Sequence, residues 1–435
     1  MPAITLLLIA TIAFGADRLG QADPAQQSPH FDIHQQTFLI DEPIPIVISG
    51  LPPGHTATVR LRGGQYLGQW ASSARFTVGP DGVVDLGRMP STGGDYHGVD
   101  AMGLFWSARH DPDARRAPAG PPPAIAQNPP PQAWKLTAEV DGSVVAETTV
   151  QRRAVAADVN VTMVRENGLV GAFYQPPGEG RHPAVIVLTG SGGGLPPATT
   201  QAGGLASRGY AVLALAYFAA EGLPPSLSRI PLEYFGKALV WLAAQPSVDP
   251  SRIGVLGISR GGELALLLGS AYPQIRTVVA YVPSNVVWPG CCDARNVPSW
   301  TVNGQPLAFV SRATHDFLAT ERATIRVERI KGAVLLISGR QDGVWSSTEM
   351  SEQVMARLRR NQFPYAYKHL AYDGAGHGIL GRPYTSTMDI NNARHPLTGQ
   401  LMHLGGTPEG TAHAREDSWR QTLAFLDEQL RHGQP

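Results

Sequence analysis

The chain has very few cysteines and no excess of charge of either sign. Its only two cysteines, Cys291 and Cys292, are neighbours. A bond between adjacent cysteines would be strained, so we expect two packed thiols rather than a redox pair. Lysine plus arginine and aspartate plus glutamate number 35 each. No overall field therefore favours nucleic acid or an anionic membrane, and we expect no nucleic-acid partner.

Long hydrophobic runs are also scarce, and we expect no stable membrane span. The one apolar stretch that stands out is Ala3 to Ala16, a charge-free run of signal-peptide length. Small residues stand where cleavage after Gly15 or Ala22 would need them, although no lysine or arginine precedes the run. We expect residues 1–22 to be a signal peptide and the protein to be exported. A lipid anchor or a mis-assigned start codon are the alternatives, and without a signal the protein would be cytoplasmic.

The 435 residues, of which 43% are hydrophobic, predict two domains. Between residues 31 and 153 short β-branched runs alternate with turn signals such as P-P-G and D-G, which predicts an all-β, immunoglobulin-like sandwich. Residues 93–107 are too irregular for a strand. The Pro-rich stretch 118–132 is typical of an exposed loop. Residues 154–166 are interpreted as a linker.

From residue 167 to 435 the pattern changes to nearly continuous apolar runs that alternate with helical stretches, which is typical of a parallel sheet covered on both faces. We predict a doubly wound α/β domain, with an irregular insertion at about 283–330. The predicted strands are 184–188, 210–216, 253–256, 278–282, 333–337 and 365–372, and the predicted helices are 201–208, 231–244, 262–270, 347–360 and 415–431.

The strongest motif runs from Arg252 to Gly269, where a short apolar strand is followed by G-I-S-R-G and a helical stretch. This is the strand, tight turn and helix that G-x-S-x-G requires in α/β-hydrolases. We expect strand and helix to pass so close together at Gly257 and Gly261 that a side chain would not fit at either position. The turn would expose the hydroxyl of Ser259 as a nucleophile, although glycine is common enough here for a chance match.

A serine nucleophile needs a base and a carboxylate, which follow it in the order Ser, Asp, His in α/β-hydrolases. Asp342 comes just after the strand 333–337, and His377 just after the strand 365–372. Asp373 is a weaker candidate because it lies in the same loop as His377. No pair has metal-ligand spacing, so we expect no metal, and we expect structural or solvated roles for His315, His369, His395, His403 and His413.

An oxyanion hole needs two backbone N–H groups. We expect one from Arg260, directly after the nucleophile, and the other from Gly192 or Gly193 in the loop T-G-S-G-G-G-L-P-P. That loop lacks the G-K-[ST] ending of a phosphate-binding P-loop. The insertion is expected to be a cap, and its aromatic residues would line an acyl pocket or form a small core of their own: Trp288, Trp300, Phe309 and Phe317.

The chain resembles the acyl-CoA thioester hydrolase and bile acid-CoA:amino acid N-acyltransferase family. The resemblance covers L-E-Y-F-G-K-A-L-V-W-L (232–242), G-V-L-G-I-S-R-G-G-E-L (254–264), residues 93–107 and residues 405–419. It implies a β-sandwich followed by an α/β-hydrolase domain, with Ser259, Asp342 and His377 as the triad. Family members that transfer the acyl group to glycine or taurine carry cysteine at the nucleophile. Serine here makes water the expected acceptor.

We therefore expect a serine hydrolase that cleaves acyl-CoA-like thioesters, with a small-molecule substrate and no cofactor. An exported member would seldom meet acyl-CoA, so the second hypothesis is a carboxylesterase similar to dienelactone hydrolase that acts on an extracytoplasmic ester. A non-catalytic binding protein is a third hypothesis. Three triad positions in the right order argue against it.

Overall fold

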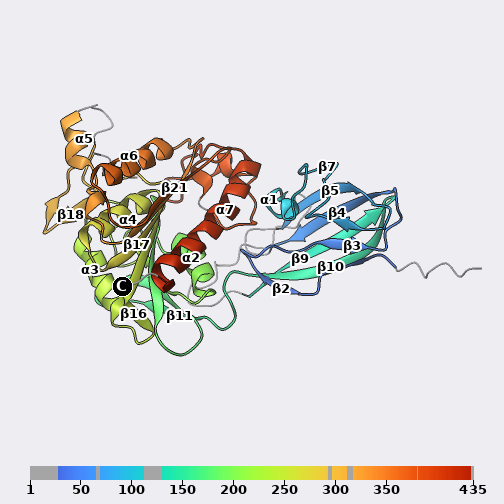
Figure 1. Cartoon of the computed structure of the whole chain (residues 1–435), viewed down its shortest axis with the longest axis horizontal. Helices are drawn as coiled ribbons and strands as arrows, with labels where there is room; N and C mark the ends of the chain where they lie inside the picture. Colours follow the sequence, from blue (N-terminus) through green and yellow to red (C-terminus); the bar gives the residue numbers. More distant parts are fainter. Residues whose placement is uncertain are drawn as a thin grey trace, which may run out of the picture.

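The computed structural model describes residues 28–64, 69–111, 130–291, 296–310, 317–379 and 381–432. Figure 1 shows a part made almost entirely of strands, coloured blue to blue-green, beside a larger part in which helices flank a central sheet. The predicted signal peptide, Cys292 and most of the Pro-rich stretch lie outside the described residues. In the part of the chain that is described, no helix is long and apolar enough to cross a membrane.

The N-terminal unit, up to Arg153, contains a seven-stranded sheet and a three-stranded sheet. Along one strand of the large sheet, buried Ala57, Val59 and Leu61 alternate with more exposed residues, which is the period that a sheet with one covered face produces. Ile48 of the small sheet belongs to the same apolar core. The elements are β1 (His30–Phe31), β2 (Thr37–Leu39), β3 (Val47–Ser49), β4 (Thr56–Gly63), β5 (Trp70–Thr77), β6 (Val84–Asp85), β7 (Gly93–Gly94), α1 (Gly103–Trp106), β8 (Arg109–His110), β9 (Gln132–Val140) and β10 (Ser143–Arg153).

The longer strands β4, β5, β9 and β10 lie in the stretch 31–153, for which the sequence predicts short strands, and residues 93–107 contain only a two-residue strand and one helical turn. The large sheet has the order β2-β10-β9-β4-β5-β7, with β8 also paired to β5. Most of its pairs are antiparallel, but β2 and β10 run parallel. The immunoglobulin-like arrangement stays a prediction.

The C-terminal unit is an α/β structure built on one eight-stranded sheet with the order β11-β12-β14-β13-β16-β17-β20-β21. From β14 to β21 the neighbouring strands are parallel, whereas β11 and β12 are antiparallel additions at one edge. The strands are β11 (Asn160–Val164), β12 (Val170–Gln175), β13 (His182–Leu188), β14 (Ala211–Ala216), β16 (Val248–Ile258), β17 (Ile275–Tyr281), β20 (Ala333–Gly339) and β21 (Tyr367–Tyr372).

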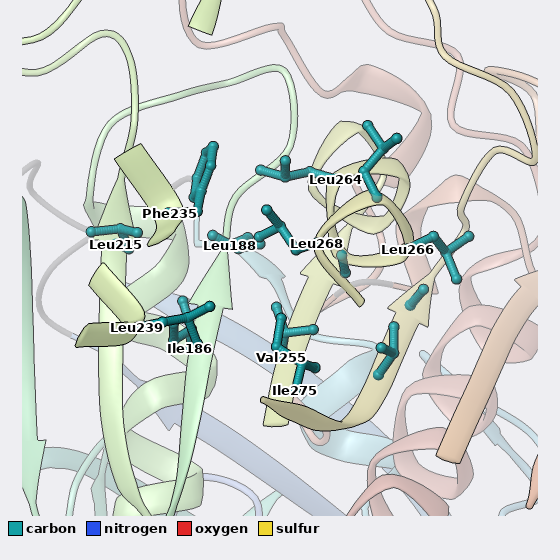
Figure 2. Packing of buried hydrophobic residues seen from close by; sticks show 14 of the residues in the cluster. Ile186, Leu188, Leu215, Phe235, Leu239, Val255, Leu264, Leu266, Leu268 and Ile275 are labelled. Carbon is teal, nitrogen blue, oxygen red and sulfur yellow. The ribbon is translucent and has the colours of Figure 1, made fainter. Parts of the chain in front are cut away.

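Helices cover both faces of this sheet, as its apolar strands require. One face packs against α3 (Leu232–Ala243), α4 (Arg260–Ala271) and α6 (Ser347–Arg360), and the other against α2 (Pro196–Ala206) and α7 (Pro408–Leu426). Val255 points into the first core and the next residue, Leu256, into the second. Figure 2 shows the first core, where strand residues Ile186 and Val255 lie beside Leu268 of α4 and Leu239 of α3.

Two features differ from the sequence-based expectation. Strand β11 lies inside the stretch 154–166 that was predicted to be a linker, so the sheet of the C-terminal unit begins before residue 167. The insertion is also partly regular. It contains β18 (Trp300–Val302), β19 (Gln305–Pro306), α5 (Phe317–Ala323) and a short 3-10 helix (Val327–Arg329), and β18 pairs with β15 (Ile230–Pro231) before α3.

Candidate active site

Ser259 occupies the sharp turn between β16 and α4. Its φ of 57° and ψ of −116° lie in a region that residues other than glycine rarely adopt. The turn closes because the flanking glycines have no side chains: a Cβ on Gly257 would lie 1.9 Å from the carbonyl oxygen of Gly261, and one on Gly261 would lie 2.2 Å from that of Thr189. The strained geometry places the serine directly before the N-terminus of α4.

The three side chains that the sequence singled out form one hydrogen-bonded chain. Nε2 of His377 lies 2.9 Å from Oγ of Ser259. Nδ1 of the same ring lies 2.9 and 3.0 Å from the two carboxylate oxygens of Asp342. The side chains of His377 and Asp342 are only 6% and 2% exposed, and Ser259 is 8% exposed. Because little water reaches these groups, their mutual hydrogen bonds are stronger than in solvent.

The carboxylate of Asp342 is held in place from several directions. Ser347 donates its hydroxyl to Oδ2 at 2.6 Å, and the backbone N–H groups of Val344 and Trp345 donate to Oδ1 at 2.9 and 3.2 Å. The ring of Trp345 meets His377 edge to face, with centroids 5.7 Å apart. These contacts hold the carboxylate of Asp342 in one position, and the carboxylate in turn holds the imidazole of His377.

The competing candidates lie in other surroundings. Asp373 is 87% exposed and pairs with Arg340 at 3.1 Å. Nε2 of His369 lies 2.8 Å from Oγ of Ser338, and that of His413 lies 2.8 Å from Oδ2 of Asp100 in the N-terminal unit. His315 lies outside the described residues.

One dismissed histidine does lie near the candidate site. Nε2 of His395 is 3.1 Å from Oγ of Ser191, in the loop after β13, and the following Pro396 packs on Gly192. Burial lowers the pKa of His395, so its ring favours the neutral form.

The loop after β13 approaches the nucleophile closely. A Cβ on Gly190 would lie 3.2 Å from Cβ of Ser259. Of the two glycines predicted as oxyanion donors, Gly193 already donates its N–H to the carbonyl of Gly190 at 3.2 Å. Gly192 is therefore the better candidate of the two. The N–H of Arg260 is at the first position of α4, where no carbonyl of its own helix can accept it.

A buried ion pair that the sequence reasoning missed lies directly behind the nucleophile. The guanidinium of Arg260 lies 3.2 Å from the carboxylate of Glu263, whose side chain is fully buried. Trp300 of the insertion donates its indole N–H to Glu263 at 2.8 Å. Burial raises the pKa of Glu263 to about 7. The sequence could have indicated this ion pair, because an arginine and a glutamate three residues apart on one helix face the same side of it.

The insertion is anchored to this ion pair rather than only overhanging the site. The carbonyl of Trp288 accepts a hydrogen bond from Arg260 at 3.0 Å. Trp300 is fully buried and belongs to the main core, so it does not line a pocket as one expectation had it. The half-buried ring of Trp288 stacks on Trp345, with centroids 6.1 Å apart. Trp345 in turn contacts the ring of His377, so Trp288 is linked to His377 through one intervening ring.

Metal ligation finds no support in the described ranges, where no group of three or more histidine, cysteine, aspartate or glutamate side chains is placed to hold an ion. The described groups around Ser259 are a hydroxyl, an imidazole and a carboxylate joined by hydrogen bonds, together with backbone N–H groups. Such an arrangement can carry out acyl transfer without a cofactor.

Comparisons with known proteins cover nearly the whole chain. Residues 41–166 match the model of the acyl-CoA thioester hydrolase/BAAT N-terminal region, and residues 230–432 match that of the BAAT/acyl-CoA thioester hydrolase C terminus. Mouse acyl-coenzyme A amino acid N-acyltransferase 1 is 32% identical over 90% of this chain and 95% of its own length. Mouse acyl-coenzyme A thioesterase 1 is 31% identical over 90% and 94%. Among solved structures, a dienelactone hydrolase-like promiscuous phosphotriesterase from metagenomic libraries is 19% identical over 63% of this chain and 99% of its own, with a TM-score of 0.40.

Proposed function

Because the chain belongs to the acyl-CoA thioester hydrolase and bile acid-CoA:amino acid N-acyltransferase family, we propose that it is a serine hydrolase that cleaves acyl-CoA thioesters. The observation that carries the proposal is the chain of hydrogen bonds from Ser259 through His377 to Asp342. Both contacts of the imidazole are short enough for proton transfer and for fixing its tautomer.

In the first half of the reaction the hydroxyl oxygen of Ser259 attacks the thioester carbonyl while Nε2 of His377 takes its proton. Asp342 holds the Nδ1 proton and stabilises the imidazolium that forms. The tetrahedral intermediate collapses to an acyl-serine as the C–S bond breaks and His377 gives its proton to the sulfur, so that CoA leaves as the thiol. Water then attacks the acyl-serine with the same histidine as base, and this releases the carboxylic acid and restores the serine.

The negative charge of the tetrahedral intermediate is met by backbone N–H groups. Arg260 supplies one at the start of α4, where the helix dipole adds to the stabilisation. Gly192 supplies the second. Its lack of a side chain lets the loop after β13 approach the acyl group.

Water rather than an amino acid is the proposed acceptor, although the relatives include both thioesterases and N-acyltransferases. An acyl ester of Ser259 is less activated toward an amine than the thioester that a cysteine nucleophile would form. Cys291 lies at the loop after β13, with its thiol 3.8 Å from the carbonyl of Ser191, and Ser259 holds the position at the turn.

Replacement of Ser259 by alanine tests the nucleophile. Ser259→Ala should leave less than about one part in 10⁴ of the wild-type rate on acyl-CoA, because the variant lacks the oxygen that would carry the acyl group. It should also stop labelling by a fluorophosphonate probe. The matched control is Ser251→Ala, an exposed serine on the same strand, which should behave as wild type. More than a few per cent of residual turnover in Ser259→Ala would refute the assignment, and an unlabelled wild type would favour a non-catalytic protein.

The second candidate function is hydrolysis of an extracytoplasmic carboxylic ester, and the apolar run at residues 3–16 is what favours it. Rates on acyl-CoA and on a p-nitrophenyl ester of the same chain length distinguish the two. We expect the larger kcat/KM on acyl-CoA. N-terminal sequencing of the mature protein tests export, and a start at residue 16 or 23 would favour the ester.

A further inference from the structure

One backbone carbonyl links the two loops that carry His377 and Asp342. The carbonyl oxygen of Leu404 accepts the N–H of His377 at 2.7 Å and the N–H of Gly343 at 3.1 Å. Gly343 is the residue directly after Asp342. The position of Leu404 therefore helps to set the distance between the imidazole and the carboxylate, although its side chain takes no part.

The residues after Leu404 are packed too closely to shift independently of these loops. A Cβ on Gly405 would lie 1.9 Å from the carbonyl oxygen of Gln341, and one on Gly376 would lie 2.2 Å from that of Leu404. Thr407 donates its N–H to Gly374 at 2.7 Å. Backbone thus touches backbone on both sides, so a displacement of residues 404–407 must move the loops on either side of it.

The same segment leads directly into α7, whose first turns lie against the N-terminal unit. Thr407 caps the helix by accepting the N–H of Gly410 at 3.0 Å. Ala412 is part of the apolar core of the N-terminal unit. Nε2 of His413 lies 2.8 Å from Oδ2 of Asp100, which also accepts the indole N–H of Trp106 at 2.7 Å.

A second set of hydrogen bonds connects the start of α7 to the N-terminal unit. Thr387 donates its N–H to the carbonyl of Trp106 at 3.0 Å and its hydroxyl to that of Pro408 at 2.8 Å. The start of α7 is therefore held both directly, through His413, and through Thr387. In both cases the partner lies within residues 93–107, the irregular segment of the N-terminal unit.

We propose that the N-terminal unit is a positioning element of the active site. Asp100 and Trp106 hold the start of α7, and the backbone of Leu404, which precedes this helix, thereby sets the distance between His377 and Asp342. The proposal rests on the proposed function. It gives His413 the role of a positioning residue that touches neither substrate nor the reacting atoms. It also explains why the two segments 93–107 and 405–419 share one interface.

The test removes the contact between His413 and Asp100 and follows the distant imidazole. In His413→Ala we expect kcat on acyl-CoA to fall between about tenfold and a hundredfold with little change in KM, because misplacement of a catalytic group by up to about 1 Å costs this much. The far-downfield ¹H resonance of the proton between His377 and Asp342 should shift or broaden. His413→Gln can still donate to Asp100 and should recover most of both.

Trp419→Phe is the matched control. Its indole N–H donates to Asp41 of the N-terminal unit at 2.7 Å, so the variant loses a hydrogen bond from the same helix to the same unit, but beyond the segment that leads to Leu404. It should lower stability and leave kcat and the resonance unchanged. An unaltered kcat and resonance in folded His413→Ala, or an equal loss in Trp419→Phe, would overturn the proposal. The resonance requires no substrate, so a wild type without thioesterase activity would defeat the proposed function and still leave the positioning measurable.

Discussion

At the scale of single residues, Asp342, the proposed orienting carboxylate, is the most sharply testable member of the candidate site. Asp342→Asn keeps the shape of the side chain, but its amide can no longer stabilise an imidazolium or select the tautomer that accepts the serine proton. We expect kcat to fall by about 10⁴. Asp373→Asn provides the control, because Asp373 lies four residues before His377 and its side chain is largely exposed. Measurement of kcat on acyl-CoA distinguishes the two variants, and similar losses in both would show that the assignment of Asp342 is wrong.

The buried carboxyl of Glu263 predicts a particular dependence of stability on pH. Burial raises its pKa to about 7 from an ordinary value of 4.5, so between these values the folded chain holds a proton that the unfolded chain has lost. The stability it contributes is complete below about pH 4.5 and is lost as pH rises through about 7, and the difference amounts to about 3 kcal/mol. Glu263→Gln should remove this part of the slope. Urea unfolding of both proteins at pH 5 and pH 8 measures it, and parallel slopes would contradict it.

At the scale of elements, the turn between β16 and α4 depends on two glycines. Gly257→Ala would place a methyl group 1.9 Å from a backbone oxygen that belongs to α4, which cannot move without carrying the helix. We expect a loss of about 4 kcal/mol of unfolding free energy, or no folded protein. Gly142→Ala is the comparison: its φ is 79° and the site is open, so the cost should be only about 1 kcal/mol. Chemical denaturation followed by circular dichroism measures both, and equal losses would contradict the packing argument.

How far the sequence predicted these elements depended on how buried they are. The central strands and helix α6 were located closely, because a strand covered on both faces is a continuous apolar run and α6 has a clear helical period. Strand β11 was missed because, at the sheet edge, its residues are mostly exposed and resemble a linker. Helix α7 begins seven residues before its predicted start at 415, although Thr407 and Pro408 are an N-cap and a first-turn proline that could have marked it.

The candidate site could be predicted only where side chains carry the chemistry. Ser259, Asp342 and His377 are recognisable because each follows a strand of a parallel sheet, and the carboxyl ends of such strands meet at one edge. The contribution of Leu404 is a backbone carbonyl, and every residue has one. No residue type at that position could have revealed it.

At the scale of the whole molecule, the contact between the two units should itself depend on pH. The hydrogen bond that the imidazole of His413 donates to Asp100 raises the pKa of His413. Burial opposes ionisation of Asp100, but hydrogen bonds from His413 and Trp106 outweigh it and hold its pKa below the usual range. His413 therefore contributes stability that is complete below its unfolded pKa and is lost as pH rises through the raised value. Asp100 contributes stability that is present above its unfolded pKa and is lost as pH falls through the lowered value.

The pH ranges in which His413 and Asp100 each contribute stability overlap at mildly acidic pH, where both side chains are charged. The thermal midpoint of wild type should therefore exceed that of His413→Gln most at about pH 5 to 6. The difference should shrink at pH 9, where the imidazole is neutral. Because half of the His413 side chain is exposed, solvent screening limits the difference to about 1 kcal/mol or less, and added salt should reduce it further. Calorimetric scans of both proteins across this pH range measure it. A difference in thermal midpoint that is constant with pH would show that the charges of His413 and Asp100 contribute nothing to the contact between the two units.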